Sequence, residues 1–237
     1  MSTALRVLLV AAMLLMVSAA FGQQAYVSRF DAYAGYAFLD SPHVNLFENG
    51  FSTQFGVRPK TWYSLGIDYT WARGDLNLTP DMLTTELQQS LGAKLGQLAA
   101  AGVLPAGYKL AVPAKSTTQT FAVGPQLAYR RMTHATLFLR PVFAGLIYEV
   151  ATPTPPAGDL IAAGIVKGLA PEGKKTNTTW FLGFGGGFDI IFSKHVSWRV
   201  QADLVYDHLF NDLLKDGRFT TRFALGPAFN FGRNIKE

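Results

Sequence analysis

The sequence predicts an all-β chain that closes into a barrel of eight antiparallel strands. Eight segments between residues 30 and 231 alternate apolar with polar residues, and within them every charge falls on the same alternate phase. Short and long connections also alternate along the chain. Successive strand side chains point to opposite faces, so each strand has one apolar and one polar face. Eight such strands in a row favour closure into a barrel.

The apolar phase locates the strands in chain order. It carries Phe30, Tyr36, Phe38; Phe51, Phe55, Val57; Tyr63, Leu65, Ile67, Tyr69, Trp71; Phe121, Val123, Leu127, Tyr129; Leu137, Leu139, Phe143, Ile147; Trp180, Leu182, Phe184, Phe188, Ile190; Trp198, Val200, Leu204, Tyr206; and Phe219, Phe223, Leu225, Phe229, Phe231. The fifth strand is the least regular, because Phe138, Leu146 and Tyr148 share the polar phase with Arg140. Prolines 125, 141 and 227 each remove a ladder donor, so local bends or bulges are expected.

The connections indicate an up-and-down barrel. Hairpin-length links are expected around Pro59-Lys60, over 131–135 and over 193–195. Longer connections are expected over 39–49, 74–116, 151–177 and 211–217. This alternation places tight turns at one end of the barrel and free loops at the other, which is the layout of bacterial outer-membrane barrels.

The composition of the polar phase decides which face meets the surroundings. A soluble, lipocalin-like barrel would turn its apolar face inward and use Lys and Glu freely on the wet face. Here all ten Lys and five Glu are expected in loops, turns or strand ends, and small residues dominate the polar phase. Large aromatics on the other phase suit a lipid-facing girdle. The sequence therefore predicts an eight-stranded antiparallel up-and-down transmembrane β-barrel with two helix-containing extracellular loops.

The N-terminus predicts export. Arg6 precedes an unbroken apolar run over 7–17, and small residues at 20 and 22 suit cleavage before Gln23, so residues 1–22 are expected to be a signal peptide. The barrel is expected over 23–232, with a short periplasmic tail over 233–237. The chain has no Cys, and its net charge of +5 is scattered, which argues against a nucleic-acid partner.

The last strand carries a motif typical of outer-membrane barrels. Gly226, Phe229 and Phe231 resemble the terminal glycine–aromatic–aromatic assembly signal, although Ala224 replaces its polar position. The mature chain as a whole is similar to the small eight-stranded bacterial outer-membrane β-barrel proteins of the OmpA-type transmembrane class. The resemblance implies an outer-membrane location and contact with outer-membrane lipids and lipopolysaccharide. It also implies assembly through periplasmic chaperones and the barrel-assembly machinery.

The interior of an eight-stranded barrel is just wide enough for side chains to fill. A balanced set of inward charges is expected there: Arg29, Asp31, Asp68, Arg140, Asp189, Arg199, Asp203 and Arg222. Buried charges must be paired. They predict either a solid plug, together with Gln54, Gln126, Gln201 and Asn230, or a gate in which exchange of arginine partners opens a narrow path.

Two of the long loops carry helix signals. In the first, Thr79-Pro80 precedes a leucine repeat, which predicts an amphipathic helix near Pro80 to Ala101 with a contact face of Leu83, Leu87, Leu91, Leu95 and Leu98. In the second, Asp159 is expected to cap a helix that starts at Leu160. The two helices could pack together over the barrel mouth, bind an extracellular protein or ligand, or lie on the outer leaflet.

Catalytic signals are weak. His195-Val-Ser197 resembles the His-x-Ser of lipid A deacylases, with Asp207 following, but the histidine is expected at a periplasmic turn. No histidine spacing suggests a metal site, and no cofactor is expected. The chain is therefore expected to be a non-enzymatic envelope protein with a structural or interaction role. The alternative is a narrow gated channel for small solutes or ions, and a lipid-modifying enzyme is a distant third.

Overall fold

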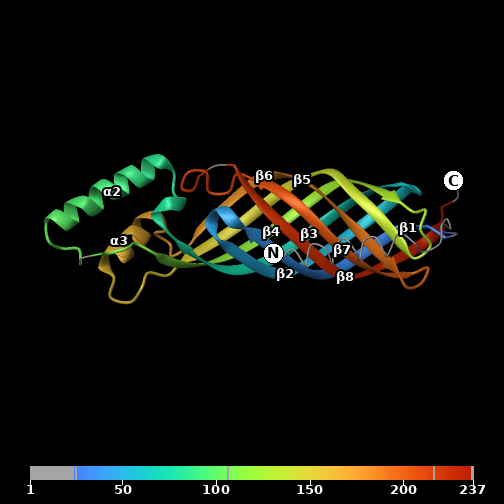
Figure 1. Cartoon of the computed structure of the whole chain (residues 1–237), viewed down its shortest axis with the longest axis horizontal. Helices are drawn as coiled ribbons and strands as arrows, with labels where there is room; N and C mark the ends of the chain where they lie inside the picture. Colours follow the sequence, from blue (N-terminus) through green and yellow to red (C-terminus); the bar gives the residue numbers. More distant parts are fainter. Residues whose placement is uncertain (1–23, 25, 106, 216, 236–237) are drawn as a thin grey trace, which may run out of the picture.

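The computed structural model describes residues 24, 26–105, 107–215 and 217–235, which form a closed antiparallel barrel (Figure 1). Each strand pairs with its chain neighbours, and β1 closes the barrel against β8. The strands are β1 (Ser28–Ser41), β2 (Leu46–Lys60), β3 (Tyr63–Leu78), β4 (Val112–Tyr129), β5 (Ala135–Pro153), β6 (Lys175–Ile191), β7 (Val196–Asp207) and β8 (Arg218–Asn234). The predicted eight-stranded barrel is confirmed. The predicted signal peptide, 1–22, lies outside the described residues.

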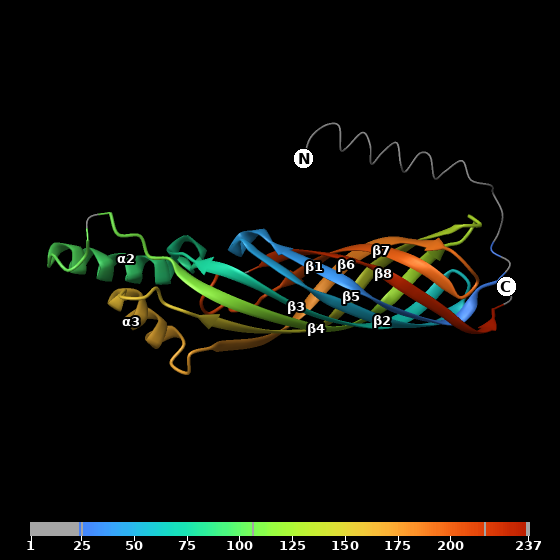
Figure 2. The same cartoon turned by 90° about the horizontal axis from the view of Figure 1, so that it is seen from below.

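The two ends of the barrel differ as predicted. Tight turns join β2 to β3, β4 to β5 and β6 to β7 at the turn end. The loop end carries two 3-10 turns (η1, Pro42–Val44; η2, Pro80–Met82) and two helices (α2, Thr85–Ala100; α3, Leu160–Leu169). Both helices lie beyond the loop end, next to the extended ends of β3 and β4 (Figure 2). Within the described part of the chain, neither helix is long and apolar enough to cross a membrane.

Three of the predicted long connections are shorter in the structure, because the strands on either side extend further. The connection expected over 39–49 is much shorter, because β1 and β2 stay paired as far as Ser41 and Leu46. The helix expected from Pro80 begins only at Thr85, after the 3-10 turn. The start of α3 is as predicted: Asp159 Oδ1 accepts hydrogen bonds from the backbone N–H groups of Ile161 (3.1 Å) and Ala162 (2.9 Å).

The outer wall of the barrel is aromatic and apolar. The outward side chains include Phe51, Ile67, Trp180, Phe184 and Phe223, which are all 44–54% exposed. Rings stack across neighbouring strands, as in Phe51–Trp71 and Phe30–Phe231, both with centroids 5.7 Å apart. Such cross-strand pairs stabilise the sheet and also pin its register. The wall thus presents the charge-free phase to the surroundings.

A bulge in β5 reverses the side-chain phase of that strand. Between Arg140 and Phe143 the strand holds one more residue than either neighbour, so Pro141 and Val142 both face outward. Beyond this point Phe143 and Ile147, expected on the outer wall, are buried inside, while Leu146 is 57% exposed. Pro141 has no N–H to give the ladder, so it favours a bulge at this position.

Candidate functional site

The lower part of the lumen holds an ion cluster of Asp31, Arg58, Asp189 and Arg199, all buried (the lower ion cluster). Arg199 is its centre. It donates to both carboxylate oxygens of Asp189 at 2.8 and 3.0 Å and to Asp31 at 3.2 Å. Arg58 pairs with the other oxygen of Asp31 at 3.2 Å. Each charge therefore has an opposite partner, which offsets the cost of its burial.

A second cluster fills the middle of the lumen and comprises Asp68, Arg140, Asp203 and Arg222 (the upper ion cluster). Arg222 reaches Asp203 at 2.7 Å and Asp68 at 3.2 Å, and Arg140 pairs with the same two carboxylates. All four side chains are at most 6% exposed. Shared partners cross-link β3, β5, β7 and β8 through the barrel interior.

Polar and aromatic side chains close the space around the two clusters. Gln54 and Gln201 connect the clusters, since Arg199 donates to Gln54 at 3.0 Å and Gln201 donates to Asp203 at 2.6 Å. Phe143 lies against the upper ion cluster, with the Arg140 guanidinium 4.1 Å from its ring centroid. Its ring fits because the residue opposite is Gly183. A Cβ atom at that position would collide with the ring. The middle of the lumen is a filled core.

Above this core the lumen holds two buried acids that were expected in a loop or at a strand end. Thr118 donates to Glu48 at 2.9 Å and Ser116 donates to Glu149 at 3.0 Å. Thr118 and Ser116 are two residues apart on one face of β4, so the two carboxylates flank that face. The extension of β2 and the β5 bulge turn these side chains inward.

The loop between β7 and β8 covers the mouth with Leu209, Phe210, Leu213 and Leu214 (the outer lid), each at most 8% exposed. Arg218 anchors the loop, because it donates to the Leu209 carbonyl at 2.9 Å and pairs with Asp207 at 3.3 Å. The lid joins one buried cluster with Leu83, and an isolated β-bridge links Leu83 to Leu214. The last loop, rather than the two helices, thus seals the barrel.

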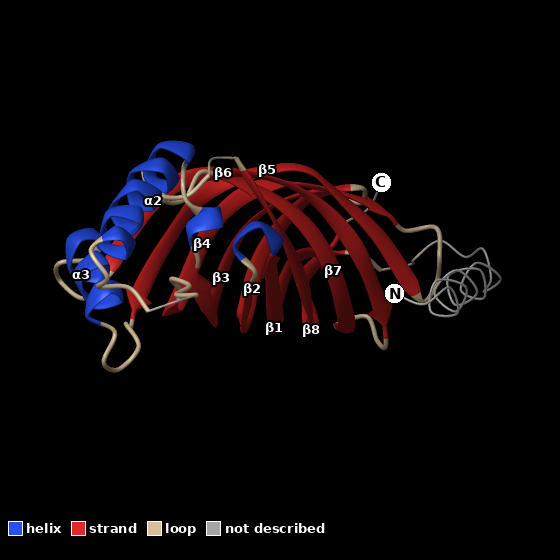
Figure 3. Cartoon of the chain, turned by 60° about the vertical axis from the view of Figure 1, so that its left-hand side comes forward, coloured by secondary structure: helices blue, strands red, loops and turns tan. Residues whose placement is uncertain are grey.

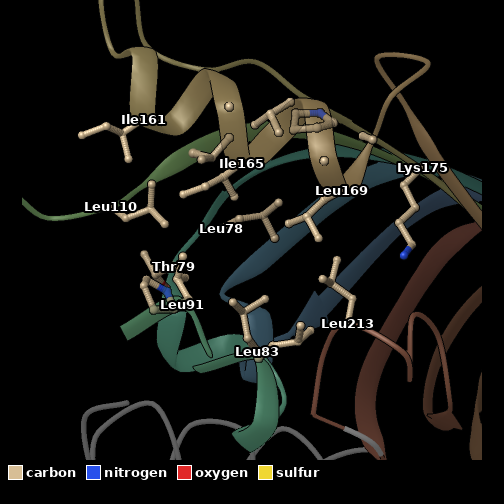
Figure 4. Close-up of a pocket in the computed structure, with 18 of the residues that line it drawn as sticks. Leu78, Thr79, Leu83, Leu91, Leu110, Ile161, Ile165, Leu169, Lys175 and Leu213 are labelled. Carbon is tan, nitrogen blue, oxygen red and sulfur yellow. The ribbon is translucent and has the colours of Figure 1, made fainter. Parts of the chain in front are cut away.

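An apolar cavity of about 670 Å³ lies between the outer lid and the two helices (the apolar pocket). The helices lie side by side beyond the barrel (Figure 3). Ile161, Ile165 and Leu169 of α3 point into the pocket from one side (Figure 4). Leu87, Leu91, Leu95 and Leu98 line it from α2, and the Lys94 and Lys175 side chains also reach its wall. No α2 residue is buried, so its leucine face is only partly covered.

A hydrogen bond connects the two helical loops. Tyr108, in the segment after α2, donates its hydroxyl to Asp159 Oδ2 at 2.8 Å. Backbone hydrogen bonds from α3, with the largest effect from Ala162, and the Tyr108 hydroxyl lower the pKa of Asp159 below its usual 3.8. Burial and the Asp159 contact raise the pKa of Tyr108 to about 12. Leu110 and Ala162 pack in one buried cluster nearby, on the same side of the pocket as the Tyr108–Asp159 hydrogen bond.

Seven of the eight predicted lumen charges belong to the two ion clusters. The exception is Arg29, which is exposed at the turn end of β1, beside the register irregularity between Ser28 and Phe30. Arg58 and Arg218 are further buried charges of the interior that the predicted set left out, as are Glu48, Glu149 and Asp207. Arg58 directly follows Val57 of the apolar phase, so it lies on the polar phase of its segment, and that position was a signal that could have found it. Of the predicted assembly signal, Phe229 and Phe231 face outward on β8.

The weak catalytic motif does not come together. His195 lies at the turn end, where its Nδ1 contacts the Asn230 carbonyl oxygen at 2.9 Å. Asp207 lies at the opposite end of β7 and pairs with Arg218. The 12 residues of β7, about 40 Å of extended chain, separate the two. Among the described residues, no group of three His, Asp or Glu side chains is placed to hold a metal ion.

Comparison of the sequence with protein-family models and with curated proteins finds no match. Solved structures do match. OprG, an outer-membrane protein of Pseudomonas aeruginosa, aligns at 10% identity over 90% of this chain and 100% of its own, with a TM-score of 0.52. Ail of Yersinia pestis aligns at 12% identity over 86% of this chain and 99% of its own, with a TM-score of 0.47. Neisserial surface protein A aligns at 12% identity over 85% and 96%, with a TM-score of 0.43. The OprG match is a likeness of fold.

Proposed function

We propose that this chain is a non-enzymatic integral protein of the bacterial outer membrane with a structural or interaction role. Its charge-free aromatic wall faces lipid, and its helical loops stand outside the cell. The wall supports this proposal, because a charge at mid-bilayer on such a surface would cost about 2–4 kcal/mol. The shared fold with OprG agrees with the location. The predicted assembly signal, Gly226 with Phe229 and Phe231, suits the barrel-assembly machinery and its chaperones as partners.

The proposal includes a closed lumen. The upper ion cluster is the observation that carries it, since two arginines and two aspartates pair across the interior and are at most 6% exposed. The outer lid adds a second, apolar barrier at the mouth. An ion crossing the barrel would have to displace both.

Planar-bilayer recording tests the closed lumen. The wild-type chain, inserted from detergent, is expected to show no steps above the bilayer background. Heat-modified mobility on SDS gels of the same preparation confirms that the barrel is folded. Steady wild-type conductance from a folded sample would reject a closed lumen and favour a channel.

One observation favours the alternative of a gated channel. Arg140 and Arg222 share both aspartates of the upper ion cluster, so an arginine can change partners without losing all of its contacts. Asp68→Ala is the variant that releases one partner from each arginine. Voltage-dependent openings in Asp68→Ala and none in Asp212→Ala, an exposed loop site, would support gating. Silence in both favours the plug.

A further inference from the structure

The apolar pocket has the size and the apolar lining of a small-molecule site. Ligand pockets span about 300–1,000 Å³ and are lined mainly by apolar side chains. This pocket measures about 670 Å³, and its walls come from α2, α3, the ends of β3 to β5 and the outer lid. It is a concave space within one chain, and this shape suits a small molecule better than a flat protein partner.

The shape of the lining favours an elongated occupant. Leu87, Leu91, Leu95 and Leu98 form one row along α2, about 17 Å long at the rise of an α-helix. Ile161, Ile165 and Leu169 form a second row on α3 opposite (Figure 4). Two facing rows of aliphatic side chains match a flexible methylene chain.

The charges on the wall indicate an acidic head group. Lys94 lies among the leucines of α2 and is exposed, and no ion pair to it forms within the described part of the chain. Lys175 also reaches the pocket, where the exposed Asp212 pairs with it at 2.5 Å. Glu149 lies on the barrel side of the pocket, but its carboxylate accepts a hydrogen bond from Ser116 and the residue is only 7% exposed. The open cation therefore lies toward the outer part of the pocket.

We propose that the apolar pocket binds one long-chain fatty acid, with its chain between α2 and α3 and its carboxylate at Lys94. This inference rests on the proposed outer-membrane function in one respect: the pocket must open to the outside of the cell for the fatty acid to reach it. Burial of each methylene from water supplies the main driving force. The lysine contributes selectivity for an acid over the corresponding alcohol.

Fluorescence binding with the full-length chain in amphipol tests the site. The probe is a dansyl-labelled undecanoic acid, and palmitate is the competitor. Empty amphipol measures background partition of the probe. We expect saturable binding of one probe per chain that palmitate displaces. Signal no greater than in empty amphipol would overturn the proposal.

Matched variants locate the site. Leu91→Glu places a charge on the pocket wall and is expected to weaken probe binding at least about tenfold. Ala93→Glu places the same charge on an exposed position of the same helix that does not line the pocket, and it should bind like wild type. Equal loss in both variants would reject the pocket as the site.

The head group is tested separately. Lys94→Gln should weaken displacement by palmitate several-fold but leave displacement by hexadecanol unchanged. Stronger competition by a lysophospholipid of the same chain length than by palmitate would reject the free acid as the ligand. Heat-modified gel mobility of every sample keeps failure of the pocket distinct from failure of the barrel.

Discussion

The hydroxyl of Tyr108 donates to Asp159 Oδ2 at 2.8 Å, while Oδ1 of the same carboxylate caps α3. One side chain thus fixes the start of α3 and ties it to the segment that follows α2. The geometry of the apolar pocket depends on this contact, because α2 and α3 form its facing walls.

The Tyr108–Asp159 contact predicts a local response to mutation. In Asp159→Ala the cap and the link are both lost, so amide hydrogens of α3 should exchange about fivefold faster. Tyr108→Phe removes only the link and should leave the cap. Hydrogen exchange read by mass spectrometry checks both variants. Unchanged exchange in Asp159→Ala would contradict the assigned cap.

The same contact predicts a pH window. The pKa of Asp159 is lowered, so its contribution to the folded loops is present above its ordinary 3.8 and is lost as the pH falls through the lower folded value. The pKa of Tyr108 is raised to about 12, so its contribution is lost as the pH rises from about 10 to about 12. Exchange of α3 amides, normalised for intrinsic rates, should be slowest between pH 4 and pH 10. If the normalised exchange rate below pH 4 and above pH 10 equals the rate between these values, the link is contradicted.

The upper ion cluster predicts a large cost for removing one partner. Arg222→Ala leaves Arg140 as the one cationic partner of Asp68 and Asp203 among the described residues, and it should lower the free energy of unfolding by about 3–5 kcal/mol. Asp212→Ala breaks the exposed pair with Lys175 and should cost less than about 1 kcal/mol. Urea titration of the chain in lipid vesicles measures both. Similar losses in the two variants would show that the interior charges add little.

The contact between Phe143 and Gly183 predicts that substitutions at the two positions partly compensate for each other in their effect on the free energy of unfolding. Gly183→Val forces a side chain into the Phe143 ring and should cost about 1–3 kcal/mol. Phe143→Ala leaves a cavity and should cost about 3–5 kcal/mol. The double variant is expected to lose less than the two single losses together, because valine occupies part of the vacated space. Strict additivity in urea titrations would mean that the two residues are not in contact.

The bulge in β5 predicts a reversed accessibility at neighbouring positions. The chain has no cysteine, so single variants can be labelled cleanly. A fluorophore at Leu146→Cys should be quenched by brominated lipid, and one at Ile147→Cys should be shielded. An unbroken β5 phase would give the opposite result, which is the pattern expected from the sequence alone.

Much of the fold could be predicted because lipid and the lumen impose a strict period of two on most strands. Trp198 and Arg199 of β7, for example, are adjacent and lie on opposite faces as expected. The period failed where one residue was inserted, as at Pro141, because a bulge shifts every later side chain of its strand. Alternation alone carries no signal for such a shift, although the proline itself was a warning.

The candidate site was harder to predict than the wall. The leucine row of α2 was visible in the sequence, but its partner surface was not. Leu209 and Leu213 of the outer lid lie in an irregular loop, where no periodicity marks a buried side chain. Their role depends on Arg218, which lies at the start of β8 and draws the loop over the mouth.

The unequal strand lengths give the barrel an oblique rim. β7 has 12 residues, whereas β4 has 18 and β5 has 19. A membrane strand needs only about 9–11 residues to cross the hydrocarbon layer. In the proposed membrane orientation, the tall wall would lift α2 and α3 clear of the lipid surface. A molecule that reaches the apolar pocket must first cross water on its own, so acyl chains short enough to dissolve as monomers should arrive fastest.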